Sequence, residues 1–145
     1  MEFRIGLQIK SLSNMIKKRI DYLSRETGVT GFQGYLLGYL IEESRQRDVF
    51  QRDVEKHMEI SRASVTSVLQ LLEKNGFILR ESVKDDARLK KIVVTEKGHR
   101  TNEQIHIMLD QLEESLGEGI SEEEMQTFIS VVQHIKNNLE RLENQ

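Results

Sequence analysis

The chain has 145 residues, a net charge of −3 at pH 7, and neither cysteine nor proline. This length suits one domain with a buried core, and the lack of cysteine excludes disulfides, thiolate metal sites and thiol redox switches. The sequence shows no signal-peptide-like segment and no apolar run near the roughly 20 residues that span a bilayer. We therefore expect a soluble, cytoplasmic protein with no membrane partner.

Charge is distributed unevenly along the chain. Residues 61–100 hold nine Lys and Arg against five Asp and Glu, a net +4, whereas residues 1–60 carry +1 and residues 101–145 carry −8. The positive segment indicates a unit that binds a polyanion, and the acidic segment is expected to lie away from it.

The first predicted element is a long helix. Apolar residues recur every three or four positions from Ile5 to Leu23, which is the spacing of one helical face and predicts an amphipathic helix over residues 3–25.

A second helix is predicted over residues 31–43. Thr30, with Gln33 three positions later, has the pattern of a capping box that starts it. The helix is apolar on more than one side, so we expect it to be buried between others. Core packing is favoured for its aromatic rings, and lining a small-molecule cavity is the weaker alternative; these rings are Phe32, Tyr35 and Tyr39.

Residues 44–61 predict the first half of a helix-turn-helix. A charged turn precedes a brief strand at Val49 and Phe50, a short helix over residues 51–58, and a tight turn over residues 58–61.

The next helix begins after Ser61, a plausible N-cap, and ends at Gly76. Val65, Leu69 and Leu72 lie on one face that points to a core. The opposite face holds small, neutral or basic side chains and no acid, a composition that suits a polyanion: Arg62, Ala63, Thr66, Ser67, Gln70 and Lys74.

A β-hairpin follows, with strands predicted over residues 77–83 and 90–95 and a link over residues 84–89. Cations lie near its tip. A helix with small polar side chains beside such a hairpin has the shape of a winged helix-turn-helix, in which the helix enters a major groove and the hairpin reaches a minor groove.

Two helices complete the chain. Thr95 starts a long helix through about residue 116, residues 117–119 break it, and Ser121 with Glu124 forms a capping box for the last helix. Apolar residues of the last helix alternate at spacings of four and three, like a coiled-coil seam. One copy of the chain offers too little body to cover the terminal helices, so we expect a second copy to do so.

At this point the sequence resembles the MarR family. Asp86-Ala87-Arg88-Leu89-Lys90 followed by Val94-Thr95-Glu96-Lys97-Gly98 is similar to the family's wing signature, and Leu72-Glu73-Lys74-Asn75-Gly76-Phe77-Ile78 is similar to the end of its recognition helix. Both motifs stand at the correct separation, and the order of the flanking helices fits over nearly the whole chain.

The resemblance implies a mainly α fold with a small β-hairpin wing, a winged helix-turn-helix with long terminal dimerisation helices. The expected layout is one domain over residues 1–145, with dimerisation helices in 1–28 and 96–145 and the DNA-binding lobe in 30–95. The dimerisation residues expected from the apolar stripes are Ile5, Ile9, Leu12, Ile16, Leu109, Leu112, Leu116, Phe128, Val132, Ile135, Leu139 and Leu142.

The resemblance also implies function: a transcriptional regulator, expected to be a ligand-responsive repressor, that binds pseudo-palindromic double-stranded DNA as a homodimer and responds to a small-molecule effector without a cofactor. Asp86 is expected to brace Arg88, the single arginine of the wing tip, rather than touch DNA. Leu71 and Ser67 stand where relatives often carry basic residues, which predicts modest reading of base edges. The residues expected to bind DNA are Gln51, Arg52, Ser61, Arg62, Ser64, Thr66, Ser67, Gln70, Lys74, Lys84, Asp86, Arg88, Lys90 and Lys91.

Two other readings stay open. One is a winged-helix module that binds proteins. The other is a metal-responsive regulator, because His99, Glu103, His106 and Asp110 lie on one helical face, although surface polar pairs are the default and no metal is predicted. We find no phosphate loop, cysteine nucleophile or serine elbow, so no enzyme is expected. The sequence does not identify the effector, the operator, or the choice between repressor and activator.

Overall fold

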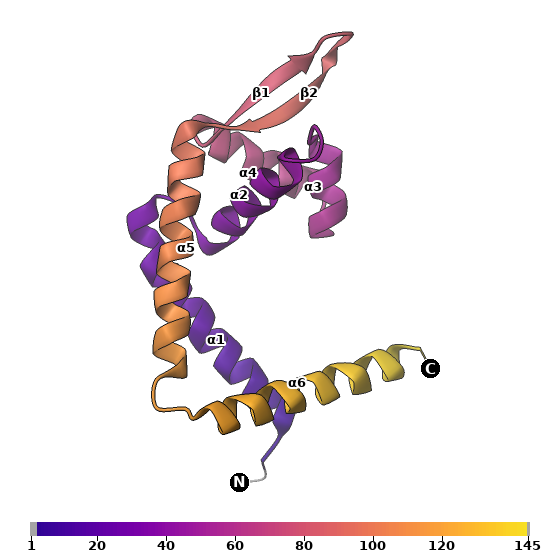
Figure 1. The fold of residues 1–145 in the computed structure, drawn as a ribbon. Coiled ribbons are helices and arrows are strands. Elements are labelled where there is room, and N and C mark those ends of the chain that lie inside the picture. The colour runs from indigo at the N-terminus through magenta and orange to yellow at the C-terminus, as the bar shows by residue number, and fades with distance from the viewer. Residues whose placement is uncertain (1–2, 145) are drawn as a thin grey trace. The chain divides into compact units, whose positions relative to one another are not determined.

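The computed structural model describes residues 3–144, which fall into two compact units divided between Leu109 and Asp110. The fold is mainly helical with one antiparallel hairpin, as predicted. Figure 1 shows the elements in chain order: α1 (Ile5–Ser24), η1 (Arg25–Thr27), α2 (Gly31–Ser44), α3 (Gln51–Met58), α4 (Arg62–Lys74), β1 (Ile78–Val83), β2 (Asp86–Val94), α5 (Glu96–Gly117) and α6 (Glu122–Glu143).

The helices start where the capping patterns predicted. Thr30 Oγ1 accepts a hydrogen bond from the Gln33 backbone N–H at 3.1 Å, and the Gln33 side chain accepts one from the Thr30 N–H at 3.0 Å. Ser61 Oγ caps α4 by accepting from the Ser64 N–H at 3.2 Å. Gly76 follows α4 with a φ of 81°, in the left-handed region that glycine adopts without a steric penalty.

The core of the first unit lies between α2, α3, α4 and the hairpin. The predicted inward residues Val65, Leu69 and Leu72 of α4 are all buried. They join buried side chains from the other elements, among them Leu36, Leu37, Leu40, Val54, Ile78 and Ile92. This packing fixes the helix-turn-helix to the hairpin, so the outer face of α4 and the hairpin are held in one frame.

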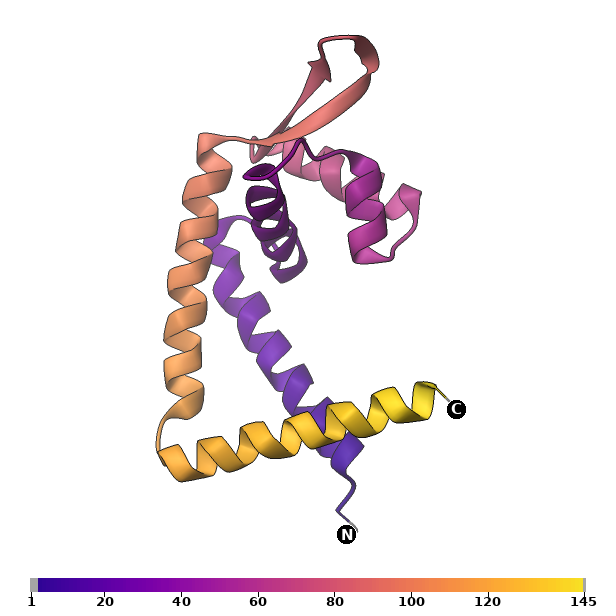
Figure 2. The same cartoon turned by 45° about the vertical axis from the view of Figure 1, so that its right-hand side comes forward.

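The hairpin, here called the wing, has a tighter turn than predicted. The turn consists of Lys84 and Asp85 alone, and β2 already begins at Asp86, so the predicted link over residues 84–89 is wrong. Ser82 pairs with Lys90 but Val83 pairs with Asp86, which places residues 87–89 in a bulge of β2. A bulge re-aims the side chains within it, and here it holds residues that the sequence pattern alone placed in a loop. Figure 2 shows the wing extending past the helices that it packs against.

The base of the wing is tied to neighbouring segments by backbone groups. Thr95 Oγ1 donates to the Gly76 carbonyl at 2.6 Å, and the Thr95 N–H donates to the Phe77 carbonyl at 3.0 Å. Val49 is not part of a strand, contrary to expectation, yet its carbonyl accepts a hydrogen bond from the Ile92 N–H at 2.7 Å. The predicted strand at residues 49–50 is therefore a single bridge-like contact that holds the loop before α3 against β2.

The second unit contains the end of α5 and all of α6. Gly119, with a φ of 78°, lies in the break between the two helices. Ser121 caps α6 as predicted: its Oγ accepts from the Glu124 N–H, and its own N–H donates to the Glu124 carboxylate at 2.8 Å. Hydrogen bonds from Ser121 to the Glu124 carboxylate, first from the backbone N–H and then from the side chain, hold the pKa of Glu124 below its usual value of 4.5.

Candidate nucleic-acid interface

The outer face of α4 carries short polar side chains between two cations. Arg62, Ser64, Ser67, Gln70 and Lys74 are exposed. Glu73 is the one acid of α4, and it is paired with Arg80 of β1. The other exposed side chains are compatible with an electronegative groove.

Some hydroxyls of α4 are already engaged. Ser67 Oγ donates to the Ala63 carbonyl at 3.1 Å. The half-buried Thr66 accepts a hydrogen bond from the Gln51 side-chain amide at 2.8 Å, a contact that links the first turn of α3 to α4. The Gln51 amide and the Thr66 hydroxyl are therefore hydrogen-bonded to each other. For either side chain to contact DNA, this hydrogen bond would have to break or be shared.

Arg88 is exposed within the bulge of β2. Asp86 Oδ1 accepts a hydrogen bond from the Arg88 backbone N–H at 2.9 Å, so the carboxylate fixes the backbone next to the arginine and leaves the guanidinium outside this contact. Lys84, in the turn, and Lys90 are also exposed. The wing thus presents cations along its tip on a braced backbone.

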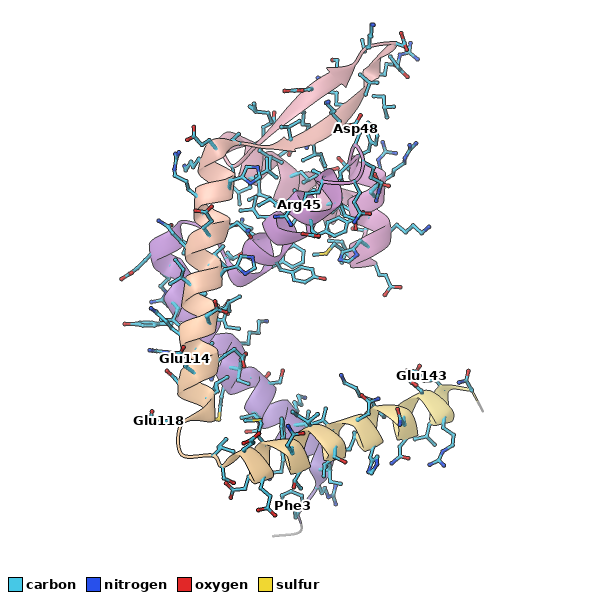
Figure 3. All side chains as sticks on the ribbon, in the orientation of Figure 1. Phe3, Arg45, Asp48, Glu114, Glu118 and Glu143 are labelled. Atoms are coloured by element: carbon cyan, nitrogen blue, oxygen red, sulfur yellow. The ribbon has the colours of Figure 1, made fainter. Side chains whose placement is uncertain are left out.

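Lys91 lies in a different setting from the other predicted cations. Its Nζ is 3.7 Å from Asp48 Oδ1, in the loop before α3, where Figure 3 labels Asp48. The Lys91 side chain is two-thirds covered. Lys91 therefore neutralises an acid beside the wing, which reduces the charge that it offers to an outside anion.

Sequence reasoning missed Arg80 of β1. Its Nε lies 3.1 Å from Glu73 Oε2 of α4, and its side chain is only 24% exposed. Arg80 is two positions after the buried Ile78, so strand alternation turns both toward the helices. An arginine at an inward strand position was the signal that could have identified it.

Arg80 lines a recess between α3, the start of α4 and the wing. The recess has a volume of about 360 Å³ and is bounded by cations with one acid, Glu55. We call it the basic recess; its charged lining is Arg52, Glu55, Arg62, Arg80, Arg88 and Lys90. Arg52, Arg62 and Arg88, all predicted to bind DNA, thus line one surface.

A separate cavity of about 590 Å³, here called the aromatic cavity, lies between α2, α3 and the part of α5 before residue 110. Tyr35 Oη and His57 Nε2 are 3.0 Å apart, and the Tyr39 ring stacks on the His57 ring with centroids 3.9 Å apart. Burial, followed by the nearby carboxylate of Glu43, raises the pKa of Tyr39. The lining also includes Ile105, so aromatic and aliphatic side chains share the cavity wall.

The preference for core packing of the α2 rings is wrong for two of them. Phe32 is 45% exposed and Tyr35 is 59% exposed. Tyr35 and Tyr39 line the aromatic cavity, whereas Phe32 lines a separate groove near Lys17 and Asn75.

Many of the predicted dimerisation residues are exposed in the single chain. On α1 these are Ile5, Ile9 and Leu12, and on α6 they are Phe128, Leu139 and Leu142. Ile16, Leu109, Val132 and Ile135 are partly covered, Leu116 is exposed, and Leu112 is buried. Exposed apolar rows of this kind are typical of surfaces that a partner covers.

The imidazole–carboxylate row of α5 does not assemble a metal site. Among residues 3–144, no group of three His, Cys, Asp or Glu side chains is arranged to hold a metal ion, and this includes the face with His99, Glu103 and His106. Over the same residues, no helix is both long and apolar enough to cross a membrane.

The helix-turn-helix and its wing define a winged helix-turn-helix protein, and comparisons with known proteins agree. Residues 27–89 match the model of the MarR family. YwhA, an uncharacterized HTH-type transcriptional regulator of Bacillus subtilis (strain 168), is 27% identical over 115 residues, which cover 79% of this chain and 81% of YwhA.

Solved structures give the same result. The crystal structure of MepR, a transcription regulator of the Staphylococcus aureus multidrug efflux pump MepA, is similar with a TM-score of 0.83 and 25% identity, over 94% of this chain and 99% of MepR. The MepR–DNA complex from S. aureus is similar with a TM-score of 0.74 and 25% identity, over 94% and 97% of the two chains. Residues 27–89 thus resemble the MarR family, and the chain is similar in sequence and fold to transcriptional regulators.

Proposed function

We propose that the chain acts as a homodimer that binds a pseudo-palindromic DNA operator, represses the genes beside it, and is released by a small-molecule effector. The observation that carries this proposal is the surface shared by α4 and the wing, where polar and basic side chains lie on one side of a rigid lobe. In the proposed complex α4 enters a major groove and Arg88 enters the adjacent minor groove. This function places the protein in the cytoplasm with its DNA.

The residues proposed to contact DNA divide by role. Those at the ends of α4 and at the start of α3, Arg52, Arg62 and Lys74, are suited to phosphates, whereas the short side chains between them face base edges. Short hydroxyls and one amide offer few bidentate contacts. Affinity is therefore expected to depend mainly on phosphate contacts and on the wing.

A homodimer is supported by the exposed apolar side chains of α1 and α6. A twofold pair would bury them and would present two copies of α4 to one duplex, with half-sites about 34 Å apart. The S. aureus MepR–DNA complex supports the DNA-bound state by similarity.

The aromatic cavity is the proposed effector site. Its stacked Tyr39 and His57 and its aliphatic side suit a flat, largely apolar molecule with a polar group near Tyr35. His57 belongs to α3, so a ligand that separates Tyr35 from His57 would act directly on the helix-turn-helix. An effector shifts the equilibrium only to the extent that it prefers one of the two states.

A gel-shift with the DNA upstream of the protein's own gene tests the proposal. We expect a shift with this duplex that an unrelated duplex of equal length does not give at moderate salt. Absence of any shift, together with capture of a protein partner by the wing, would favour the winged-helix interaction module instead. Thermal-shift screening of aromatic compounds against the wild type and Tyr39→Ala tests the effector site, because a ligand of this cavity should stabilise only the wild type.

A further inference from the structure

We propose that Arg80, at the base of the wing, is a DNA-binding residue that holds a backbone phosphate in the basic recess. This inference rests on the proposed DNA-binding function and extends it to a residue and a contact that the sequence did not indicate. The evidence consists of the position of Arg80, the state of its donors and the charge around it.

The position of Arg80 is unusual for an arginine. It pairs with Ile92 in the hairpin and points, like Ile78, to the side where the helices pack. Desolvating a guanidinium at such a position costs free energy unless its donors and its charge are satisfied. A side chain kept there without a complete set of partners indicates that an additional partner is bound in another state.

The donors of Arg80 are incompletely satisfied. Nε and Nη2 are buried and have no hydrogen-bond acceptor among the described residues. Glu73 Oε2 approaches Nε to 3.1 Å but lies out of line with its N–H, so it offsets charge without completing a hydrogen bond. The Glu73 side chain is 45% exposed, so its carboxylate is also open to solvent. An acceptor in the recess would let the guanidinium turn its fork toward it.

The positive charge of the recess favours an anion as the acceptor for Arg80. Arg52, Arg62, Arg88 and Lys90 line the recess together with Arg80, and the only acid in the lining is Glu55. Cations this close together repel one another, and an anion placed among them is favoured by each. A tetrahedral phosphate suits the arginine forks because it accepts two parallel N–H hydrogen bonds.

The location of the recess identifies the source of the phosphate. It lies between Arg62, at the start of α4, and Arg88, in the bulge of the wing. If α4 occupies the major groove and Arg88 the next minor groove, the strand that separates the two grooves passes between these residues. The phosphates of that strand would therefore lie over the recess, within reach of Arg80.

The test measures DNA affinity against salt for four proteins: wild type, Arg80→Gln, Arg80→Lys and Arg45→Gln. Arg45 is a matched control, since it is an exposed arginine of the same lobe whose guanidinium is hydrogen-bonded to Glu42 at 2.9 Å. Arg80→Gln should weaken binding at least about tenfold at low salt. It should also reduce the slope of log K against log salt by about 0.9 for each protomer. Arg80→Lys should restore the slope, because it keeps the charge, but not the full affinity.

A purely structural role for Arg80 would lower the melting temperature and leave the salt slope unchanged, and that result would overturn the proposal. If Arg80→Gln does not fold, DNA binding by the Glu73→Gln variant tests the proposal instead. This variant removes the competing carboxylate and should strengthen DNA binding, so unchanged or weaker binding would contradict the proposal.

Inorganic phosphate distinguishes the two sources of the anion. If the recess binds free phosphate and not the DNA backbone, inorganic phosphate should stabilise the wild type but not Arg80→Gln. The slopes of log K against log salt for DNA binding would then be equal in the two proteins. That outcome would refute the backbone contact. Failure of the wild type to bind any duplex would remove the proposed function and this inference with it. Wild-type binding with an unchanged slope in Arg80→Gln would remove the inference alone.

Discussion

Gly98, in the first turn of α5, is the position where a single methyl group should damage the fold most clearly. A Cβ at this residue would overlap the Phe77 carbonyl oxygen and would lie 2.5 Å from Val94 Cγ1. Both neighbours belong to the base of the wing, and the Gly98 N–H donates to Thr95 Oγ1 at 3.1 Å. The first turn of α5 thus packs directly on the wing backbone, which requires a residue without a side chain.

The size of the effect follows from two opposed terms. Alanine favours a helix over glycine by about 1 kcal/mol. An ordinary van der Waals contact needs about 3.5 Å, so the base of the wing would have to move by about 1 Å, and overpacking of this kind costs about 3 kcal/mol. Gly98→Ala should therefore lose about 2 kcal/mol net, or about 7 °C in Tm for a chain of this length.

Chemical denaturation of Gly98→Ala and Gly6→Ala measures the difference. Gly6, in the first turn of α1, has nothing within 4 Å of an added Cβ, so alanine there should be neutral or stabilising. DNA binding should also weaken in Gly98→Ala, because the wing would be displaced relative to α4. A Gly98→Ala protein as stable as the wild type would refute the close packing of α5 on the wing.

Three further changes test the interface and the two units. Arg88→Ala should cost about 1–3 kcal/mol of DNA binding for each wing with an unchanged melting temperature; unchanged affinity for a duplex with A·T-rich flanks would contradict the placement of the wing. Leu69→Ala, at a fully buried position of α4, should lose about 2–5 kcal/mol in urea unfolding, and a loss below about 1 kcal/mol would contradict that burial. Glu124→Gln should weaken α6 at neutral pH. Because hydrogen bonds from Ser121 lower the pKa of Glu124 in the folded chain, its contribution is present above the unfolded value of 4.5 and is lost as the pH falls through the folded pKa. The deficit of the variant, followed by circular dichroism, should shrink on acidification, and a deficit independent of pH would argue against the capping box.

Much of the fold was predictable because local signals agree with tertiary packing. The capping boxes at Thr30 and Ser121 act within one turn, and the inward positions of α4 repeat at helical spacing, so both could be read from sequence. The turn of the wing could not be read from the sequence. Acids at Asp85 and Asp86 favour a turn over several residues, whereas the bulge at residues 87–89 depends on cross-strand pairing.

The site shows the same division between local and long-range effects. Arg88 follows from its motif, and the inward strand position of Arg80 could have been read from the sequence. That its donors lack acceptors, however, depends on how β1 packs beside α3 and α4. The exposure of Phe32 and Tyr35 likewise depends on which side of α2 is covered, and a helix that is apolar on several sides does not determine this from its own sequence.

The most direct measurement of the proposed function is the equilibrium binding of the full chain to a labelled duplex from upstream of its own gene, with stoichiometry, at several salt concentrations. Two chains should bind each operator, and log K should fall by about 0.9 per neutralised phosphate for each unit of log salt. Binding by a single chain, or affinity that does not change with salt, would contradict a dimer that sets two recognition helices and two basic wings on one duplex.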